Sequence, residues 1–293
     1  MLRPFRFFMS SSEHAMTTVD LDRVAQALAE VAEQEIMPRW RNLAAGDVRE
    51  KTGPNDLVTV ADEAAEHALA ARLPDLLPGS IMIGEESVEK DRGLLDVLKG
   101  DQPVWIVDPV DGTKNFAEGS DRFGVMVALV ERDVTIAAVI YEPVTGRALM
   151  AEAGGGAELV DRSGERTRLN VTDTTGLDAM QGSFNFRFIP DETVRKAVRA
   201  KADAILTDRH YRRGCAAYDY RMLVTGEWDF AFYWKNMPWD HAPGLLIHQE
   251  AGGYSARFDG SPYRASELAG GILATPDAAS WRDFRSAVLA PIG

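Results

Sequence analysis

The sequence predicts a layered α/β fold, and three observations support this prediction. Short apolar segments between residues 123 and 160 are separated by short turns, which is typical of an antiparallel meander. After residue 190, segments with helical spacing alternate with short apolar segments, which favours sheets covered by helices. The chain has 293 residues and is 45% hydrophobic, so it can bury a substantial core as one large domain or two closely joined ones.

The N-terminal region predicts two amphipathic helices separated by a polar segment. Apolar side chains recur at helical spacing over residues 19–43, with Asp20 as a candidate N-cap. A polar loop is predicted for 51–56 and an extended segment for 57–60. A second helix is predicted over 62–73, ended by Pro74 and Pro78.

The rest of the chain contains short strands and further helices. A charged, mobile segment is predicted between residues 88 and 101. The predicted strands cover 81–83, 105–107, 123–130, 134–141, 147–153, 157–160, 229–233 and 271–274, and the predicted helices cover 191–202, 216–224, 240–249 and 276–290.

Three regions are expected along the chain. Residues 1–17 predict a poorly ordered tail, because their apolar stretch is too short for a signal peptide, and Met16 is an alternative start. Residues 18–175 form an N-terminal α+β part, and residues 176–293 form a C-terminal α/β part. Turn residues cluster between Asn170 and Gly182, so the boundary is soft and both parts form one unit.

The charge and cysteine content restrict the classes of partner. A formal net charge of −13 argues against a nucleic acid polymer, but it permits a small phosphorylated substrate if a divalent metal supplies positive charge. The single cysteine excludes an intrachain disulfide and fits a cytoplasmic location. No segment has the uninterrupted apolar length of a membrane helix, so no membrane partner is expected.

The central motif is WIVDPVDGTKNFAEG at residues 105–119. We expect the buried strand at 105–107 to end at Asp108 and Pro109, and Asp111 with Gly112 to form a turn. Two carboxylates and the hydroxyl of Thr113 would then share one rigid loop, which suits Mg²⁺ and a phosphate. The alternative is an ordinary turn, because Asp-Pro and Asp-Gly pairs are common turn chemistry. A metal site therefore requires oxygen ligands from elsewhere.

Three further carboxylates are candidates, each with a simpler alternative. Glu85 follows a predicted strand and a glycine, where a solvated acidic turn is the favoured interpretation for this residue taken alone. Asp240 opens a predicted helix, and Asp62 begins another, so each is also a candidate helix cap. None of the three indicates a site by itself.

Four segments together resemble the inositol monophosphatase family of magnesium-dependent, lithium-sensitive phosphatases. They are KTGPNDLVTVAD (51–62), IGEES (83–87), WIVDPVDGTKNF (105–116) and WDHAPGLLIHQEAGG (239–253). They occur in the family's order, and the likeness spans roughly residues 20 to 290. The resemblance implies a layered αβαβα sandwich of the inositol monophosphatase and fructose-1,6-bisphosphatase type, with the active site between the sheets.

The resemblance also implies a site. Its metal ligands would be Glu85, Asp108, the backbone carbonyl of Val110, Asp111 and Asp240. Four carboxylates in one place require divalent cations, so two or three Mg²⁺ ions are expected. By the same resemblance, Asp62, Thr113 and Glu85 would orient and deprotonate the attacking water, while backbone amides of Gly112 and Thr113 would hold phosphate oxygens.

The substrate contacts implied by the resemblance are Lys51, Asp111, Gly112, Thr113, Gly214, Cys215, Ala216, Tyr233, Lys235 and Asp240. Lys51 would lie near the outer metal, with a solvated loop lysine as the alternative. Cys215 replaces a family threonine and is expected to act as a small buried hydrophobic residue. Tyr233 replaces a glutamate common in inositol-cleaving members, and with Trp234 and Lys235 it would stack on a flat group, bind a second anion or pack at a strand end. Lys114 likewise differs from the threonine of those members.

The function predicted from this resemblance is Mg²⁺-dependent hydrolysis of a small phosphate monoester. Inositol monophosphate is the default substrate. Histidinol phosphate or a 3′(2′),5′-bisphosphate nucleotide is the alternative. A different class of function is a metal-binding regulatory protein without catalysis. The resemblance also implies a homodimer.

Overall fold

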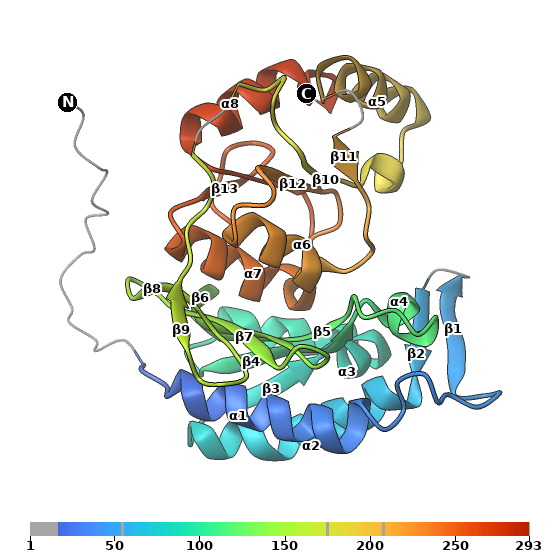
Figure 1. Cartoon of the computed structure of the whole chain (residues 1–293), viewed down its shortest axis with the longest axis vertical. Coiled ribbons are helices and arrows are strands. Elements are labelled where there is room, and N and C mark those ends of the chain that lie inside the picture. The colour runs from blue at the N-terminus through green and yellow to red at the C-terminus, as the bar shows by residue number, and fades with distance from the viewer. Residues whose placement is uncertain (1–16, 54–55, 174–175, 207–208, 293) are drawn as a thin grey trace.

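The structure is a computed structural model that describes residues 17–53, 56–173, 176–206 and 209–292. The predicted tail, apart from Thr17, and the alternative start at Met16 lie outside the described residues. The described chain forms five layers, which Figure 1 shows from bottom to top. They are α1 (Leu21–Val31) with α2 (Val60–Leu76), a seven-stranded sheet, α6 (Ala216–Val224) with α7 (Pro238–Glu250), a five-stranded sheet, and α5 (Glu192–Leu206) with α8 (Ala278–Ala287). This arrangement confirms the predicted αβαβα sandwich.

The seven-stranded sheet confirms the predicted meander. Its strand order is β3-β4-β5-β6-β7-β8-β9, and every neighbouring pair is antiparallel except β3 with β4. The exposed strand β9 was not predicted, because its three residues RTR carry no apolar alternation. The strands are β3 (Ile81–Gly84), β4 (Val104–Asp111), β5 (Gly124–Glu131), β6 (Val134–Glu142), β7 (Arg147–Glu152), β8 (Gly156–Val160) and β9 (Arg166–Arg168).

The five-stranded sheet is mixed, with the order β11-β10-β12-β14-β13. Strand β10 pairs in parallel with both β11 and β12, whereas β14 pairs antiparallel with β12 and β13. Only β12 and β14 were predicted. Strands β10 and β11 are two or three residues long, and β13, with the sequence YSAR, has no apolar run. The strands are β10 (Gly182–Phe184), β11 (His210–Tyr211), β12 (Phe230–Tyr233), β13 (Tyr254–Arg257) and β14 (Ile272–Thr275).

A small hairpin replaces the predicted polar loop at residues 51–56. Strand β1 (Val48–Gly53) pairs antiparallel with β2 (Asp56–Thr59), with Arg49 opposite Val58 and Glu50 opposite Leu57. The loop prediction was therefore wrong for residues 51–53 and 56, whereas 54–55 lie outside the described residues. The predicted extended segment is confirmed at 57–59, but Val60 already belongs to α2. The hairpin escaped prediction because its first strand is almost entirely polar. Its consequence for function is that Lys51 projects from a strand.

Three helix predictions need correction. Asp20 is confirmed as the N-cap of α1, since its Oδ1 accepts hydrogen bonds from the backbone N–H groups of Asp22 and Arg23, but the helix ends in a π-helical turn at Ile36. Helix α2 continues past Pro74, which lies in its last turn, where one missing backbone donor is tolerated. The segment predicted as mobile forms α3 (Glu85–Lys90) and a 3₁₀-helix (Arg92–Lys99), because Val88 and Leu98 bury their side chains.

Two apolar cores hold the seven-stranded sheet in place. One lies between this sheet and α1 and α2, and the other lies between the sheet and α6 and α7. Strand β4 is buried along its whole length, so its side chains are fixed by packing on both faces. None of the helices among the described residues is long and apolar enough to cross a membrane.

Candidate active site

Strand β4 presents two aspartates between the sheets. The strand was predicted to end at Asp108 and Pro109, but it continues to Asp111, with Asp108 opposite Met126 and Asp111 opposite Gly124. The register shifts between these two pairs, so a bulge accommodates Pro109 and Val110. Oδ1 of Asp108 accepts a hydrogen bond from the N–H of Val110 at 3.1 Å. Both carboxylates are therefore fixed at the end of a buried strand.

Gly112 is required by the turn that follows. Its φ of +85° lies in the left-handed region, which favours glycine. A Cβ at this position would also lie 2.9 Å from the carbonyl oxygen of Arg122 and 3.1 Å from Cβ of Cys215. The short helix α4 (Thr113–Ala117) begins immediately afterwards. Gly112 thus lets the backbone pass between two other segments of the site.

Asp240 joins the two aspartates of β4 from the other half of the chain. It is the third residue of α7, whose first position is Pro238 and whose N-cap is Met237, so the capping alternative for Asp240 was wrong. One carboxylate oxygen each from Asp108, Asp111 and Asp240 lie within 4.8 Å of one another. Segments more than 120 residues apart in the sequence therefore meet at one point.

These carboxyl groups are costly to ionise together. Burial, followed by the charge of Asp111, raises the pKa of Asp240 to about 7. Burial, followed by the charge of Glu85, raises the pKa of Asp108 well above its usual range. A cation between them would remove this penalty, and a set of oxygen donors suits Mg²⁺ better than zinc. The residues present therefore fit a hard divalent metal ion.

Asp111 is held by the start of α6. Its Oδ2 accepts hydrogen bonds from the N–H of Ala217 at 2.6 Å and from Sγ of Cys215 at 3.0 Å. Cys215 is buried, as expected of a small hydrophobic residue, and it is also the N-cap of α6, because Sγ accepts a hydrogen bond from the N–H of Tyr218. The segment that begins with Gly214, Cys215 and Ala216, which was predicted to contact substrate, thus lies against the predicted metal ligand Asp111.

Asp62 and Thr113 form a hydrogen-bonded pair beside the aspartates. Oγ1 of Thr113 lies 3.1 Å from Oδ1 of Asp62 and 3.1 Å from the carbonyl oxygen of Val110. Oδ2 of Asp62 accepts hydrogen bonds from both the N–H and the hydroxyl of Thr59, the N-cap of α2. Burial raises the pKa of Asp62 to about 6, against the lowering effect of these bonds. Asp62 therefore closes a capping box and also accepts from Thr113.

Glu85 lies in a neighbouring group of carboxylates around Lys51. Nζ of Lys51 lies 2.9 Å from Glu85, 2.6 Å from Glu86 and 2.9 Å from Glu89. The lysine side chain is only 8% exposed, so the solvated-loop alternative for Lys51 was wrong. Burial opposes its charge, but Glu85 and Glu86 raise the pKa of Lys51 above its usual value. Glu85 is outside the group of three aspartates, yet its charge acts on Asp108.

Glu86 and Glu89 were not predicted as site residues. On α3, Glu89 lies four residues after Glu85 and three after Glu86, spacings at which helical side chains are neighbours. Residues 84–87 were predicted only to end a strand, and the mobile segment was predicted to begin at residue 88. A helical reading of residues 85–90 would have brought the three side chains together. Their shared partner, Lys51, is brought to them by the β1–β2 hairpin, which the local sequence did not predict.

The remaining residues predicted to contact substrate lie on α6 and β12 and in the loops beside them. Gly214 has a φ of +69° and precedes Cys215 and Ala216 at the start of α6. Tyr233 ends β12, and its hydroxyl donates a hydrogen bond to Oδ2 of Asp219 at 3.1 Å. Nζ of Lys235 lies 4.7 Å from the ring centroid of Phe188.

Asp219 was missed by the sequence analysis. It lies on α6 and is 3% exposed, and its Oδ2 accepts hydrogen bonds from Tyr233 and from Ser183 at 2.6 Å. Its Oδ1 is buried without a hydrogen-bond partner among the described residues. Burial raises the pKa of Asp219 to about 7. An aspartate inside a mostly apolar helix was the signal that a closer reading would have used.

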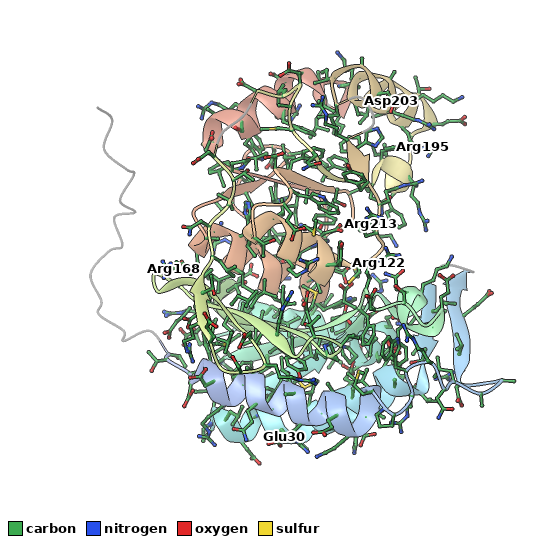
Figure 2. All side chains as sticks on the ribbon, viewed as in Figure 1. Glu30, Arg122, Arg168, Arg195, Asp203 and Arg213 are labelled. Carbon is green, nitrogen blue, oxygen red and sulfur yellow. The ribbon has the colours of Figure 1, made fainter. Side chains whose placement is uncertain are left out.

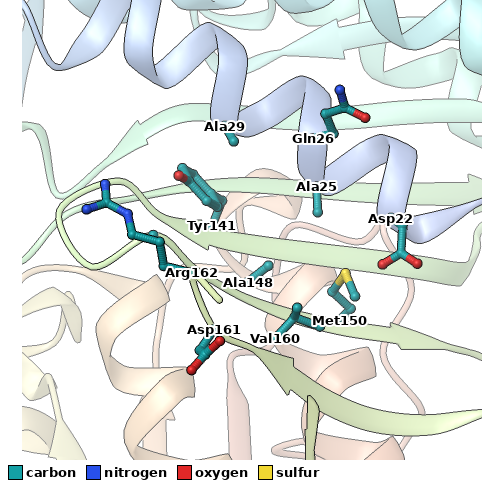
Figure 3. Close-up of a pocket in the computed structure, with 11 residues that line it drawn as sticks. Asp22, Ala25, Gln26, Ala29, Tyr141, Ala148, Met150, Val160, Asp161 and Arg162 are labelled. Carbon is teal, nitrogen blue, oxygen red and sulfur yellow. The ribbon is translucent and has the colours of Figure 1, made fainter. Parts of the chain in front are cut away.

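A surface groove is separate from these residues. It has a volume of about 290 Å³ and lies between α1 and strands β6 to β8 (Figure 3). Its lining includes Ala25, Tyr141, Met150 and Arg162, and none of the predicted site residues lines it. The candidate site is therefore indicated by carboxylates that converge from distant segments, and not by this groove.

Comparisons with known proteins point to one family. A profile described as "Inositol monophosphatase family" matches residues 18–288. The chain is 32% identical over 236 residues to a fructose-1,6-bisphosphatase/inositol-1-monophosphatase of Thermotoga maritima, covering 78% of this chain and 82% of that protein. It is 35% identical over 213 residues to an inositol-1-monophosphatase of Mycobacterium leprae, covering 71% and 70% respectively. A Vibrio cholerae relative, 31% identical over 71% of this chain and 74% of its own length, is named Nus factor SuhB.

Solved structures show the same architecture. Thermotoga maritima IMPase superposes with a TM-score of 0.74 at 27% identity, covering 93% of this chain and 97% of that one. The extragenic suppressor protein suhB of Bartonella henselae gives a TM-score of 0.75 at 26% identity, covering 92% and 97%. Both matches cover more than nine tenths of this chain, so they extend over both halves of the sandwich.

Proposed function

This chain belongs to the inositol monophosphatase family, a family of phosphoric monoester hydrolases, and we propose that it hydrolyses a small phosphate monoester with the help of Mg²⁺. The observation that carries this proposal is the convergence of Asp108, Asp111 and Asp240 to within 4.8 Å in a buried position. Three adjacent carboxylates with raised pKa values are stable as anions only beside a cation.

The metal site proposed here consists of oxygen donors. Asp108, Asp111 and Asp240 would hold Mg²⁺ together with the carbonyl of Val110, and Glu85 would contribute from the adjoining group around Lys51. Mg²⁺, when bound, supplies Lewis acidity that offsets negative charge and favours ionisation of water. We propose two or three ions, because the four carboxylates of Glu85, Asp108, Asp111 and Asp240 bring several negative charges to one region.

The hydrogen-bonded pair of Thr113 and Asp62 is proposed to handle the proton. The hydroxyl of Thr113 would position the attacking water, and Asp62 would accept its proton through that hydroxyl, with Glu85 assisting. A pKa of about 6 suits Asp62 for this role, because it is ionised near neutrality and still basic. The amides of Gly112 and Thr113 would hold phosphate oxygens.

Inositol monophosphate is the default substrate, as the names of several relatives suggest. Histidinol phosphate and a 3′(2′),5′-bisphosphate nucleotide are the alternatives, because Tyr233 stands where inositol-cleaving members carry a glutamate. Its hydroxyl is already directed to Asp219 at 3.1 Å. We propose that the active protein is a cytoplasmic homodimer, which subcellular fractionation and analytical ultracentrifugation would test.

The proposal is tested by phosphate release from a panel of sugar, polyol, amino-alcohol and nucleotide phosphates, with and without Mg²⁺. We expect Mg²⁺-dependent release from at least one ester. Asp111→Asn should lower kcat by about 10² or more while the circular dichroism spectrum stays unchanged, because the amide keeps the shape but not the charge. Release from no ester would favour the second candidate, a metal-dependent regulatory protein, to which the name Nus factor SuhB of the Vibrio cholerae relative draws attention.

A further inference from the structure

Two arginines approach the proposed phosphate-binding turn from different segments. Nδ2 of Asn115, in α4, donates hydrogen bonds to the carbonyl oxygens of both Arg122 and Arg213, at 2.9 and 3.0 Å. The carbonyl of Arg122 also packs against Gly112. Figure 2 labels both arginines where the C-terminal half of the chain meets α4. One amide thus holds the two arginine-bearing segments next to the turn that contains Gly112.

Neither arginine side chain is neutralised by the protein. Both are half-buried, and the Nε atom of each is buried without a hydrogen-bond partner among the described residues. No carboxylate of the described chain lies within 4 Å of either guanidinium. Arg257 also has a buried, unpartnered Nε, but it forms an ion pair with Glu267. Other half-buried arginines of the described chain also form no ion pair, but their Nε atoms are not buried without a partner. The guanidinium of Arg213 lies over the ring of Tyr211, 5.2 Å from its centroid, and this contact leaves its Nε without an acceptor among the described residues. A buried donor without an acceptor is costly.

Other groups at the same place are also suited to an anion. Burial and the charge of Asp111 raise the pKa of Asp219, whereas the charge of Arg213 lowers it. Lys235 acts in the same way on Asp240. The neutral Tyr233, at the end of β12, lies beside Asp219. Two cations, Arg213 and Lys235, therefore act on acidic groups in or next to the proposed site.

We propose that Arg122 and Arg213 form a second anion subsite, which binds a phosphate or carboxylate of the substrate other than the phosphate that is cleaved. The planar guanidinium donates paired hydrogen bonds to such groups, and an anion would supply the partner that both Nε atoms lack. The inference rests on the proposed function and refines it. It favours phosphate esters with a second negative group over phosphates of neutral polyols.

The test compares matched substrates that differ in one anionic group. 2-Phosphoglycerate is compared with glycerol 2-phosphate for a carboxylate, and adenosine 3′,5′-bisphosphate with adenosine 3′-phosphate for a phosphate. The expected result is a kcat/KM at least tenfold higher for the member of one pair that carries the second anionic group. The pair that shows this difference tells whether the subsite binds a carboxylate or a phosphate. Arg122→Gln and Arg213→Gln should each reduce this ratio about tenfold, mainly through KM, whereas Arg213→Lys retains part of it.

Arg168→Gln is the control, because Arg168 lies on β9, away from the site (Figure 2). It should leave the ratio unchanged, and thermal melts establish that the variants fold. A wild-type ratio near one for both pairs, or a ratio that survives both glutamine variants, would overturn the subsite. Equal hydrolysis of esters with and without the second anionic group refutes the subsite but leaves the proposed function intact. Absence of hydrolysis of every ester refutes the proposed function and the subsite with it.

Discussion

The thiol of Cys215 donates a hydrogen bond to Oδ2 of Asp111 at 3.0 Å. The two residues are 104 positions apart, and the contact fixes the start of α6 against the end of β4. The same sulfur accepts a hydrogen bond from the N–H of Tyr218 and caps the helix. Cys215 therefore links the fold of the C-terminal half to the carboxylate site.

This link predicts a graded effect of substitution on stability. Cys215→Ala removes the helix cap and one of the donors to Asp111, so we expect the free energy of unfolding to fall by about 1 kcal/mol. Cys215→Ser retains both bonds and should stay within about 0.5 kcal/mol of the wild type. Urea denaturation at constant Mg²⁺ measures the difference, and equal stability of the two variants would contradict the capping role.

The Thr113–Asp62 pair predicts a loss of rate without a loss of metal. In Thr113→Ala the hydroxyl that lies 3.1 Å from Asp62 is gone, so kcat should fall by about 10²–10⁴, the range of general base catalysis. Mg²⁺ affinity should stay within twofold, because no carboxylate is removed. Thr145→Ala, at an exposed turn position, is the matched control and should keep full activity. An alanine variant that retains more than a tenth of kcat would exclude this role for Thr113.

The raised pKa of Asp240, about 7, predicts that Mg²⁺ binding strengthens between pH 6 and 8. Protons on the buried carboxyl groups must leave before the metal binds, so affinity should increase by up to about tenfold per pH unit for each proton released. Titration calorimetry at several pH values measures this slope, and Asp240→Asn should reduce it. A pH-independent affinity would show that these carboxylates are already ionised.

The same carboxyl groups have the opposite effect on the metal-free protein. A carboxyl whose pKa is raised on folding contributes stability that is full below its unfolded value, about 4, and is lost as the pH rises through about 7. Without Mg²⁺ the melting temperature should therefore fall from pH 5 to pH 8, and saturating Mg²⁺ should remove most of this fall. An equal slope with and without the metal would argue against binding at these groups.

His248 predicts a pH effect of the other sign. Its ring is fully buried, both ring nitrogens lack hydrogen-bond partners among the described residues, and burial lowers its pKa to about 4. The unfolded chain takes up the proton near pH 6.5, so this contribution to stability is present above pH 6.5 and is lost as the pH falls to about 4. His248→Met should raise the melting temperature and flatten the acid branch. A lower melting temperature at neutral pH would show that the ring is needed for packing.

The elements predicted correctly from the sequence share one property: their signal is local. Strands β5 to β8 agree closely with the predicted segments, because apolar runs and short turns follow one another within 40 residues. Helix α6 begins and ends at the predicted residues. Asp20 is a cap whose hydrogen bonds are all formed within three residues.

The errors fall where tertiary contacts override local pattern. The segment after Ser87 has the composition of a mobile loop, but Val88 and Leu98 give it an apolar anchor. Proline was expected to end both β4 and α2, yet a bulge in β4 and the last turn of α2 each accommodate it. Arg122, Arg213 and Asp219 had no local signal, because their surroundings come from segments that meet only in the folded chain.

The sequence by itself determined the layered architecture, the family and the acidic residues of the proposed metal site, because these depend on residue types and their order. Only the tertiary structure decided how the acids are divided. It joined Asp108, Asp111 and Asp240 in one group and placed Glu85 with Glu86 and Glu89 around Lys51. The physical reason is that a charge interacts with whatever lies within a few ångströms of it, and that neighbourhood is created by the packing of strands and helices that are remote in sequence.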